Sequence, residues 1–459
     1  MISILGLRIS AIFRRIAPDP FVLAVLLTLL TLVLAITLTD SGPADLIDMW
    51  GGSGGVWSLL AFAMQMCLIL VTGHALASSP PVSSLLDRLS SLPRSSAQAA
   101  TLVATVACVA AVLNWGLGLI AGALMARRVG LAMARKGVPT HYPLLAAAGY
   151  LGLMVWHGGL SGSAPLKVTT AKDIAEVFGP GAPFGPIDLT RTLFSPMNLF
   201  ITGGLLVLSP LLVSRLSPRD PRHIEPADRF VSAAVAAPAP AKDDRKPLIP
   251  RLLEDTPLTT IVLVAFIAWW AWRYYIPREG HASGLLSLSP DSVNLTMLLL
   301  GLVLHGTPAR YLAAVEDAAR GCAGIILQFP LYAGIMGLMK ASGLTALFAE
   351  KLAAGATPET LPLFTFLAAC VINLFVPSGG GQWAVQGPIA MQTAIDAGVA
   401  PEKMVMAVAY GDQLTKMLQP FWALPLLAIT GAKARDIVGY TAIVMVVAGA
   451  WIGIGLVLF

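Results

Sequence analysis

The sequence predicts an all-α polytopic membrane protein, built from an inverted repeat of about five helical elements in each half. Hydrophobic residues make up 56% of the 459 residues and charged residues only 12%. The mean hydropathy of +0.77 is far above that of soluble domains. Long apolar runs recur along the chain, and most are long enough to cross a bilayer core of ~30 Å. These runs lie near 20–38, 56–77, 190–214, 257–276, 290–305, 321–340 and 437–459.

Basic residues predict the orientation, because Lys and Arg collect in cytoplasmic loops. Arg8, Arg14 and Arg15 place the N-terminus in the cytoplasm, and no small-residue cleavage site follows them. The run 20–38 is therefore expected to be a retained span and not a signal peptide. The loop 39–55 contains Asp but no Lys or Arg, so we expect it outside. Followed along the chain, the same rule predicts a multi-pass protein whose C-terminus lies outside, which is the periplasm if the membrane is a bacterial inner membrane.

A basic stretch divides the chain into two halves. Eight Lys and Arg residues lie between Arg215 and Arg251, together with the sequence Ala-Pro-Ala-Pro. Such a composition is typical of a mobile linker, and its charge predicts a cytoplasmic one, at 215–256. The first half is then 1–214 and the second is 277–459. The connecting span 257–276 carries the chain outward, so the second half begins on the opposite side of the membrane.

The two halves share matching residues at a nearly constant offset. Gln65 matches Gln328 and Asp87 matches Glu350, each 263 residues on. Asn114 matches Asn373, 259 residues on, and Pro165 matches Pro425, 260 residues on. Because the halves start on opposite sides, these matches predict an inverted repeat. Chance similarity between apolar helices is the alternative.

Each half is expected to contain one re-entrant hairpin and one broken helix. The first hairpin, 97–126, is interrupted at Asn114-Trp115-Gly116-Leu117-Gly118, and its second limb before Arg127 has only about ten residues. The first broken helix, 141–166, has its break at Gly158-Gly159. The second half repeats this plan with a hairpin at 358–392 and a broken helix at 403–430.

The most informative interruption is Asn373 to Trp383, which reads NLFVPSGGGQW inside an apolar stretch. Pro377 lacks an amide donor, and the three glycines carry a large backbone entropy penalty, so the segment cannot be helical throughout. Unwound backbone at membrane depth is tolerated only where protein buries it or a watery cavity adjoins it. Two inverted hairpins and two broken helices that meet near the midplane are the plan of a secondary transporter. No Walker motif is present, and a channel remains the alternative.

The second half supplies most candidate cargo ligands. Amides at a helix break hold carboxylates well, and this tip offers several donors with almost no fixed charge. That balance suits a small monocarboxylate better than a di- or tricarboxylate. Trp383 is either an apolar wall for the cargo or an ordinary packing aromatic. The donors are Ser378, the amides of Gly379, Gly380 and Gly381, and Gln382.

Ionisable residues at membrane depth are the next candidates, because burying them is costly. Asp412, Lys416 and Gln419 share one helical stripe at i, i+4 and i+7. Asp412 and Lys416 either form a structural ion pair, or Lys416 attracts an anion and Asp412 takes part in ion coupling. His157 could carry a coupling proton or be a structural histidine. In the first half, Asn114 and Trp115 at the tip and Ser161 at the broken helix are the further candidates.

Other classes of function have weaker support. Gly159-Leu160-Ser161-Gly162 matches the GxSG of rhomboid-like intramembrane serine hydrolases, with His305 or His74 as the base. The span number is roughly double that of such enzymes, and the repeat gives Ser161 no special place. HExxH is absent, and the four cysteines lie in apolar segments without CxxC spacing, so we expect no metal site. The net charge of +5 arises from loop asymmetry, which predicts no nucleic-acid partner.

The run NLFVPSGGGQWAVQGP at 373–388 closely resembles the short-chain fatty acid transporter family, the acetoacetate/butyrate permeases of the ion-transporter superfamily. The agreement extends to AYGDQLTKMLQPFWALPLL at 409–427 and LNWGLGLIAGALMARRV at 113–129. This resemblance implies a scaffold domain, a mobile transport domain, elevator-like alternating access and a homodimer. It also implies site roles for Asn114, Asn373, Ser378 to Gln382, and the segment from Asp412 to Lys416.

We therefore expect an elevator-type carrier of short-chain monocarboxylates such as butyrate or acetoacetate, and no enzyme. A carrier of dicarboxylates or other organic anions is the alternative. No cofactor is expected beyond a coupling H⁺ or Na⁺, with Asp412, Asn114, Asn373 and His157 as candidates for the coupling site. Sodium carriers of the superfamily often have Ser-Asn-Thr at their tips. The tips here read Asn-Trp-Gly and Pro-Ser-Gly-Gly-Gly, which favours the proton.

Overall fold

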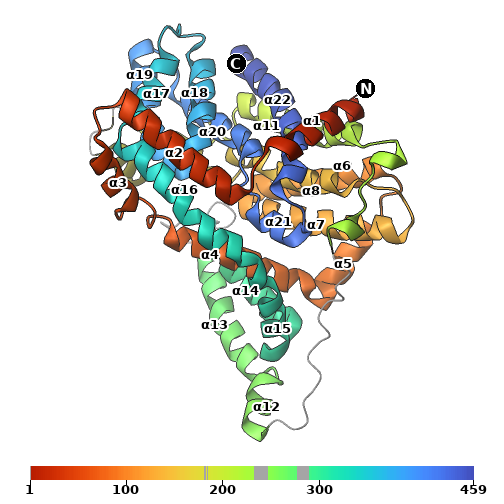
Figure 1. The fold of residues 1–459 in the computed structure, drawn as a ribbon. Coiled ribbons are helices and arrows are strands. Elements are labelled where there is room, and N and C mark those ends of the chain that lie inside the picture. Colours follow the sequence, from red (N-terminus) through yellow and green to blue (C-terminus); the bar gives the residue numbers. More distant parts are fainter. Residues whose placement is uncertain (1, 180–181, 183, 232–246, 277–288) are drawn as a thin grey trace.

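The computed structural model describes residues 2–179, 182, 184–231, 247–276 and 289–459, and in these residues the chain is helical without strands (Figure 1). The prediction of an all-α membrane protein is therefore confirmed. Nine helices within the described ranges are long and apolar enough to cross a membrane. Large apolar side chains such as Leu29, Val33 and Phe266 are exposed on these helices, which suits a lipid environment.

The first half begins with a basic helix that the apolar runs did not predict, α1 (Ile2–Ile16). It continues with α2 (Pro20–Leu38), α3 (Pro43–Gly51), α4 (Leu60–Ser78), α5 (Pro80–Ser90), α6 (Ser96–Leu113), α7 (Trp115–Arg135), α8 (Tyr142–Tyr150), α9 (Ser163–Leu166), α10 (Ala171–Phe178) and α11 (Pro196–Leu216). Between α8 and α9 the chain forms two 3₁₀ turns, Leu151–Met154 and Trp156–Gly158. The first broken helix is therefore α8, these turns and α9.

The second half follows two connecting helices, α12 (Leu248–Glu254) and α13 (Leu258–Tyr275). Its helices are α14 (Pro290–His305), α15 (Pro308–Ala319), α16 (Ala323–Ala341), α17 (Leu344–Ala353), α18 (Leu361–Phe375), α19 (Gly379–Ala397), α20 (Pro401–Thr415), α21 (Leu424–Thr430) and α22 (Ala434–Leu458). The chain leaves α20 through a 3₁₀ turn, Lys416–Leu418, before α21 begins. This is the second broken helix.

The repeat is visible in the order of these helices. The helices α4, α5, α6 and α7 begin at residues 60, 80, 96 and 115, and α16, α17, α18 and α19 begin at 323, 344, 361 and 379. Each of the second four therefore starts 263 to 265 residues after its counterpart. The halves also contain short helices, α3 and α5 in the first and α15 and α17 in the second, which hydropathy alone does not reveal.

The hairpin tips are narrower than the sequence suggested. The first hairpin is α6 and α7, and Asn114 alone separates its limbs as the N-cap of α7. The second hairpin is α18 and α19, and residues 376–378 separate its limbs. Ser378 is the N-cap of α19, because its hydroxyl accepts a hydrogen bond from the Gly381 amide. The three glycines are thus the first turn of a helix, and the break lies just before them.

The second limb of the first hairpin is longer than expected. The estimate of about ten residues is wrong, because α7 continues through Arg127 and Arg128 to Arg135. These arginines do not end the helix, and Arg128 forms an ion pair with Asp87 on α5 (Nη1–Oδ1 2.9 Å). Beyond them, Val129 and Met133 are fully buried and hold the last turns of α7 in place.

Part of the expected linker is anchored to the helices. Glu225 accepts hydrogen bonds from both terminal nitrogens of Arg14 on α1, and its carbonyl accepts one from the Tyr142 amide at the start of α8. The described residues 217–231 therefore pack against the protein, contrary to a linker that is mobile throughout. The remaining stretch 232–246, which carries Lys242, Arg245 and Lys246, and the start of the second half at 277–288 lie outside the described residues.

Two groups of helices form the molecule (Figure 1). In one group, α16 packs against α2, α3 and α4, and α14 packs against α4 and α13. The other group contains both hairpins, both broken helices, α11 and α22. The short helix α5 contacts α4 of the first group and α7 of the second, and the short helix α17 contacts α16 of the first group and α18 and α19 of the second. Each hairpin is therefore entered through an equivalent short helix.

Candidate functional site

Each hairpin tip is hydrogen-bonded to the break of the broken helix in its own half. In the first half, the Leu160 amide donates to the Val112 carbonyl at 2.7 Å and the Trp115 amide donates to the Ser161 hydroxyl at 3.0 Å. In the second half, Trp422 Nε1 donates to the Pro377 carbonyl at 2.9 Å, and Gln419 Nε2 donates to Asn373. The same tip-to-break unit is thus built twice.

The two units meet through a tryptophan cluster formed by Trp115, Trp156 and Trp422. The Trp115 ring packs edge to face with Trp422, with centroids 5.1 Å apart, and with Trp156, with centroids 6.5 Å apart. Trp156 also lies directly against the second tip, because a Cβ added at Gly379 would be 2.7 Å from its ring. The structure therefore brings the two tips together, with three aromatic rings between them.

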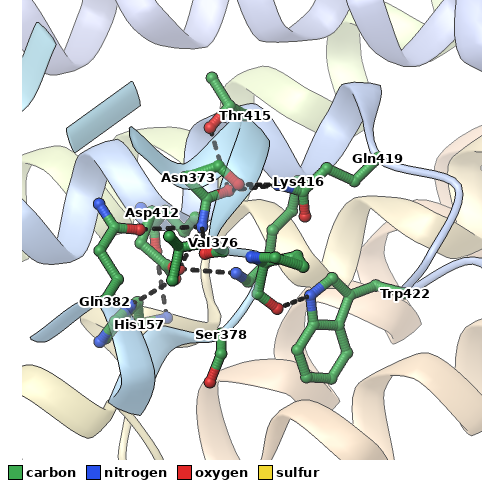
Figure 2. Close-up of polar contacts among 12 residues, drawn as sticks. His157, Asn373, Val376, Ser378, Gln382, Asp412, Thr415, Lys416, Gln419 and Trp422 are labelled. Atoms are coloured by element: carbon green, nitrogen blue, oxygen red, sulfur yellow. Dashed lines mark hydrogen bonds and ion pairs between the residues drawn. The ribbon is translucent and has the colours of Figure 1, made fainter. Parts of the chain in front are cut away.

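A buried polar network lies beside this cluster, formed by His157, Asn373, Asp412 and Lys416 (Figure 2). All four side chains are 0% exposed. Asp412 Oδ1 accepts hydrogen bonds from Lys416 Nζ at 2.7 Å and from Asn373 Nδ2 at 2.6 Å, and its Oδ2 pairs with His157 Nδ1 at 2.8 Å. The two halves of the repeat are therefore joined at one carboxylate, which three nitrogen donors satisfy.

The hydrogen bonds assign the tautomer of His157. Its Nε2 accepts from the Ala164 amide at 3.0 Å, so the ring proton lies on Nδ1 and is donated to Asp412. The imidazole is therefore neutral in this arrangement. With Asp412 negative and Lys416 positive, the network carries no net charge.

Asn373 and Gln382 are committed to contacts within the protein. Asn373 Nδ2 also donates to Gln382 Oε1 at 3.0 Å, and its Oδ1 accepts from the Thr415 hydroxyl at 3.1 Å. Gln382 Nε2 donates to the Ala369 carbonyl and to Gln386 Oε1. These side chains fasten α18, α19 and α20 to one another, and their polar atoms are occupied.

Lys416 is held differently from its neighbours. Its ammonium has three N–H donors. Within the described residues, one of them makes a hydrogen bond, and its acceptor is Asp412. Nζ lies 5.6 Å from the ring centroid of Trp156 and 5.3 Å from that of Trp422. Cation–π attraction to these two rings stabilises the positive charge of Lys416, in addition to its ion pair with Asp412.

The backbone amides of the two tips are not equally available. At the first tip, the Trp115 amide is bonded to Ser161, and those of Gly116 and Leu117 are bonded to Asn114 Oδ1. At the second tip, the amides of Gly379 and Gly380 have no acceptor in the described part of the chain. Gly380 is exposed, and a Cβ there would have only Ser163 within 4 Å. The second tip therefore has two backbone amides without an acceptor in the described part of the chain, whereas the amides at the start of α7 are all bonded.

Other candidates from the sequence have different surroundings. Trp383 is 0% exposed and packs against Phe178 of α10, with centroids 5.8 Å apart, in a second core cluster. These contacts favour the packing interpretation. Asn114 is the cap of α7, so its structural counterpart is Ser378 and not Asn373. Trp156 and Trp422 were missed by the sequence reasoning, although each lies beside a predicted break, where an aromatic residue is a usable signal.

The contacts give no support to a hydrolytic site. Ser161 accepts a hydrogen bond from the Trp115 amide, while His74 pairs with Asp317 at 3.3 Å. His305 Nε2 is bonded to the Ala75 carbonyl at 2.8 Å. Both proposed bases therefore have partners other than Ser161. Among the described residues, no group of three or more His, Cys, Asp or Glu could hold a metal ion.

Comparisons with known proteins give consistent results over the whole chain. A family model described as "Short chain fatty acid transporter" matches residues 1–459. A protein of Escherichia coli (strain K12), provisionally named short-chain fatty acid transporter, is 43% identical over 458 residues, which cover 98% of this chain and 99% of that protein. A Haemophilus influenzae protein with the same provisional name is 38% identical over 445 residues, 96% of each chain.

Two solved structures show a more distant similarity. The Alcanivorax borkumensis YdaH transporter, described as having an unusual topology, aligns with a TM-score of 0.43 and 19% identity, covering 96% of this chain and 97% of its own. Neisseria gonorrhoeae MtrF, of a class of antimetabolite efflux pumps, aligns with a TM-score of 0.35 and 16% identity, covering 98% and 96%.

Proposed function

Because the chain belongs to the short-chain fatty acid transporter family, we propose that it is a secondary carrier of short-chain monocarboxylates such as butyrate or acetoacetate. The cargo binds as an anion at the second hairpin tip, and alternating access exposes that tip to one side of the membrane and then to the other. A coupled cation drives the movement. Transport of a small molecule in a membrane is the function of the family, and the cargo, site and coupling are the parts proposed here.

The observation that carries this proposal is the unequal availability of the tip amides. Two adjacent donors, those of Gly379 and Gly380, match the two oxygens of a single carboxylate. Ser163 stands next to them as a further donor. Lys416 is the one cation of the network, so a second carboxylate on the cargo would have no cation of its own. The rings of Trp115, Trp156 and Trp422 suit a short apolar tail. A cargo with one carboxylate and a short apolar tail therefore fits the second hairpin tip best.

The network favours a proton over sodium as the coupling ion. Sodium is a hard cation that needs several oxygen ligands, by the same chemistry as calcium. Asp412 is the one carboxylate in the network, and both of its oxygens face nitrogen donors from Lys416, Asn373 and His157. A sodium ion would have to displace at least one of these donors. A proton needs no coordination shell.

The proposal also covers the membrane, the orientation and the moving parts of the protein. Because the relatives are bacterial, we place the protein in a bacterial inner membrane. The distribution of basic residues places its N-terminus in the cytoplasm and its C-terminus in the periplasm. The group of helices around α16 is the proposed scaffold, and the group with both hairpins is the proposed moving part. We further propose a homodimer.

Uptake by reconstituted proteoliposomes tests the proposal. Labelled butyrate should enter above the level of protein-free liposomes, which measure passive permeation of the acid. Excess unlabelled acetoacetate should compete, and excess succinate should not. An inward proton gradient should raise accumulation, and a sodium gradient at equal pH should not. Equal competition by succinate would mean that the cargo is a dicarboxylate and not a monocarboxylate. Accumulation that responds to the sodium gradient alone would mean that the coupling ion is sodium and not the proton.

A further inference from the structure

We propose that each carboxylate travels with one proton held on Asp412, and that this proton releases Lys416 to pair with the cargo. The inference rests on the proposed monocarboxylate transport and deepens it. In this proposal Lys416 pairs with two carboxylates in succession, first that of Asp412 and then that of the cargo. Transport is then electroneutral, with one proton for each anion.

The charge balance of the network leads to this conclusion. Asp412 and Lys416 are both 0% exposed and cancel one another, while His157 is neutral. An additional anion beside such a group would be an uncompensated charge in a medium of low polarity, which is strongly unfavourable. A proton that neutralises Asp412 leaves Lys416 without a counter-ion. The incoming carboxylate then restores neutrality.

Asp412 is the group that receives the proton. A proton on Nε2 of His157 would oppose the Ala164 amide at 3.0 Å, a backbone donor that is fixed in place. A proton on Oδ1 of Asp412 opposes the Lys416 ammonium, which is a flexible side chain and can move away. The titratable groups that face Asp412 are Lys416 on its own broken helix, His157 on the first broken helix and the Cys370 thiol on α18. From α18 the neutral amide of Asn373 also bonds to Asp412, and from α19 the neutral amide of Gln382 bonds to Asn373.

Lys416 lies close enough to the tip to change partners. Its ammonium lies between the rings of Trp156 and Trp422. Trp156 packs directly against Gly379, and Trp422 is hydrogen-bonded to the Pro377 carbonyl. Each of the two rings next to Nζ therefore also contacts the tip that carries the free amides. Cation–π contact with the two rings is available along the way, so the charge need not pass through a wholly apolar gap.

The proposed cycle balances at each step. One proton leaves the water and binds a carboxylate oxygen of Asp412, which breaks the ion pair with Lys416. One monocarboxylate anion enters and pairs with Lys416, so the loaded site has no net charge. After release of the anion and the proton, the Asp412–Lys416 pair forms again, and the empty site is also neutral. Neither the loaded nor the empty carrier moves charge across the membrane.

Wild-type protein provides the first test. In proteoliposomes with valinomycin, uptake of labelled butyrate is measured at a fixed inward proton gradient while potassium diffusion potentials of either sign are imposed. The uptake rate should be the same at every potential. A rate that changes with the potential means that charge moves with the cargo, which overturns the proposal. Absence of uptake above protein-free liposomes means instead that the underlying monocarboxylate transport is wrong.

The variant Asp412→Asn provides the second test, because asparagine has the shape of the protonated acid and cannot titrate. Exchange of labelled for unlabelled butyrate should slow as pH rises in the wild type and lose this dependence in the variant. Proton-driven accumulation should fall to the protein-free level. The matched control is Asp87→Asn, at a half-exposed carboxylate paired with Arg128, which should behave as wild type. Accumulation by Asp412→Asn equal to that of wild type overturns the proposal, and if the variant does not fold, the measurement on wild type still decides.

Discussion

Three successive glycines at the second tip differ in what surrounds them, and the differences separate packing from cargo binding. A Cβ at Gly379 would be 2.7 Å from the Trp156 ring and 3.0 Å from His157. At Gly380 the nearest atoms belong to Ser163, at 3.9 Å and beyond. Gly380 is also exposed. Close backbone packing requires glycine at the first position and not at the second.

The substitution Gly379→Ala should therefore destabilise the fold by ~1–3 kcal/mol, because the added methyl overfills a packed site. Gly380→Ala should leave stability within ~0.5 kcal/mol, since its side chain meets open space. Thermal unfolding of the two purified variants measures this difference. Equal losses of stability would show that the tip is packed differently from the structure.

The variant Gly380→Val tests whether the exposed amide is the cargo site. The branched side chain would stand over the free amides beside Ser163, so butyrate uptake should fall to the protein-free level while thermal stability stays close to that of wild type. The reason is obstruction of the cargo, since Gly380 itself is not tightly packed. Uptake at the wild-type rate would remove this tip from the site.

Two buried tryptophans provide a matched comparison. Trp422 Nε1 donates to the Pro377 carbonyl, whereas Trp383 Nε1 has no acceptor among the described residues. Trp422→Phe should lose one tip hydrogen bond, worth ~1 kcal/mol, and weaken apparent butyrate affinity about fivefold. Trp383→Phe should leave affinity unchanged, because its ring packs against Phe178 away from the tryptophan cluster. A larger loss of butyrate affinity in Trp383→Phe than in Trp422→Phe would indicate that Trp383 contacts the cargo.

The roles of single residues were the least predictable part of the molecule. Asn114 and Asn373 match in the sequence, but the first caps α7 and the second joins a network with Asp412 and Gln382. The spacing of Asp412 and Lys416 on one helix made an ion pair one of two alternatives, and the two side chains are in contact. His157 pairs with Asp412 from 255 residues away. No local pattern can specify a partner brought together only by the tertiary fold.

The long spans show what hydropathy can predict. The run 20–38 coincides with α2, and 257–276 differs from α13 by one residue at each end. The amphipathic helices α1 and α5 were missed, because their apolar residues do not form continuous runs. The fold class followed from composition and from the repeat. The lengths of the hairpin limbs did not, since α7 continues past Arg127 and Arg128 to Arg135 although these charges interrupt its apolar run.

One element has no counterpart in the other half of the repeat. Residues 167–195, which include α10, separate α9 from α11, whereas only 431–433 separate α21 from α22. This insertion reaches across to the second half. Phe178 packs against Trp383 on α19, and Arg191 forms an ion pair with Glu402 at the start of α20 (Nη2–Oε1 2.7 Å). The insertion therefore fastens the second limb of the second hairpin.

We expect Phe178→Ala to loosen α19 selectively. Loss of this aromatic contact should cost ~1–3 kcal/mol, less than for a fully buried phenylalanine because Phe178 is half-buried. Hydrogen exchange should speed up in residues 379–397 and stay unchanged in α7. Arg191→Ala is the comparison, because its side chain is 57% exposed and such ion pairs contribute little. Faster exchange in both hairpins alike would contradict a clamp specific to α19.

At the scale of the whole molecule, the inverted arrangement requires the two hairpins to enter the membrane from opposite faces. Their tips meet at the tryptophan cluster, so the outer ends of α7 and α19 must lie far apart. Arg135 at the end of α7 and Ala400 just after α19 are both exposed, and each can be replaced by cysteine. Of the native cysteines, Cys67, Cys108 and Cys322 are buried and Cys370 is half-buried, so background labelling should be low.

In intact cells, a membrane-impermeant maleimide should label Ala400→Cys and should leave Arg135→Cys unlabelled until the membrane is permeabilised. The positive-inside rule gives this direction, because α7 ends in a basic stretch from Arg127 to Arg135. The unsubstituted protein, treated in parallel, measures the residual reactivity of Cys370. Labelling of both cysteines from the same face would mean that the hairpins do not oppose each other. A site between two tips would then be impossible, because helices that enter from one face cannot present their ends to each other across the midplane.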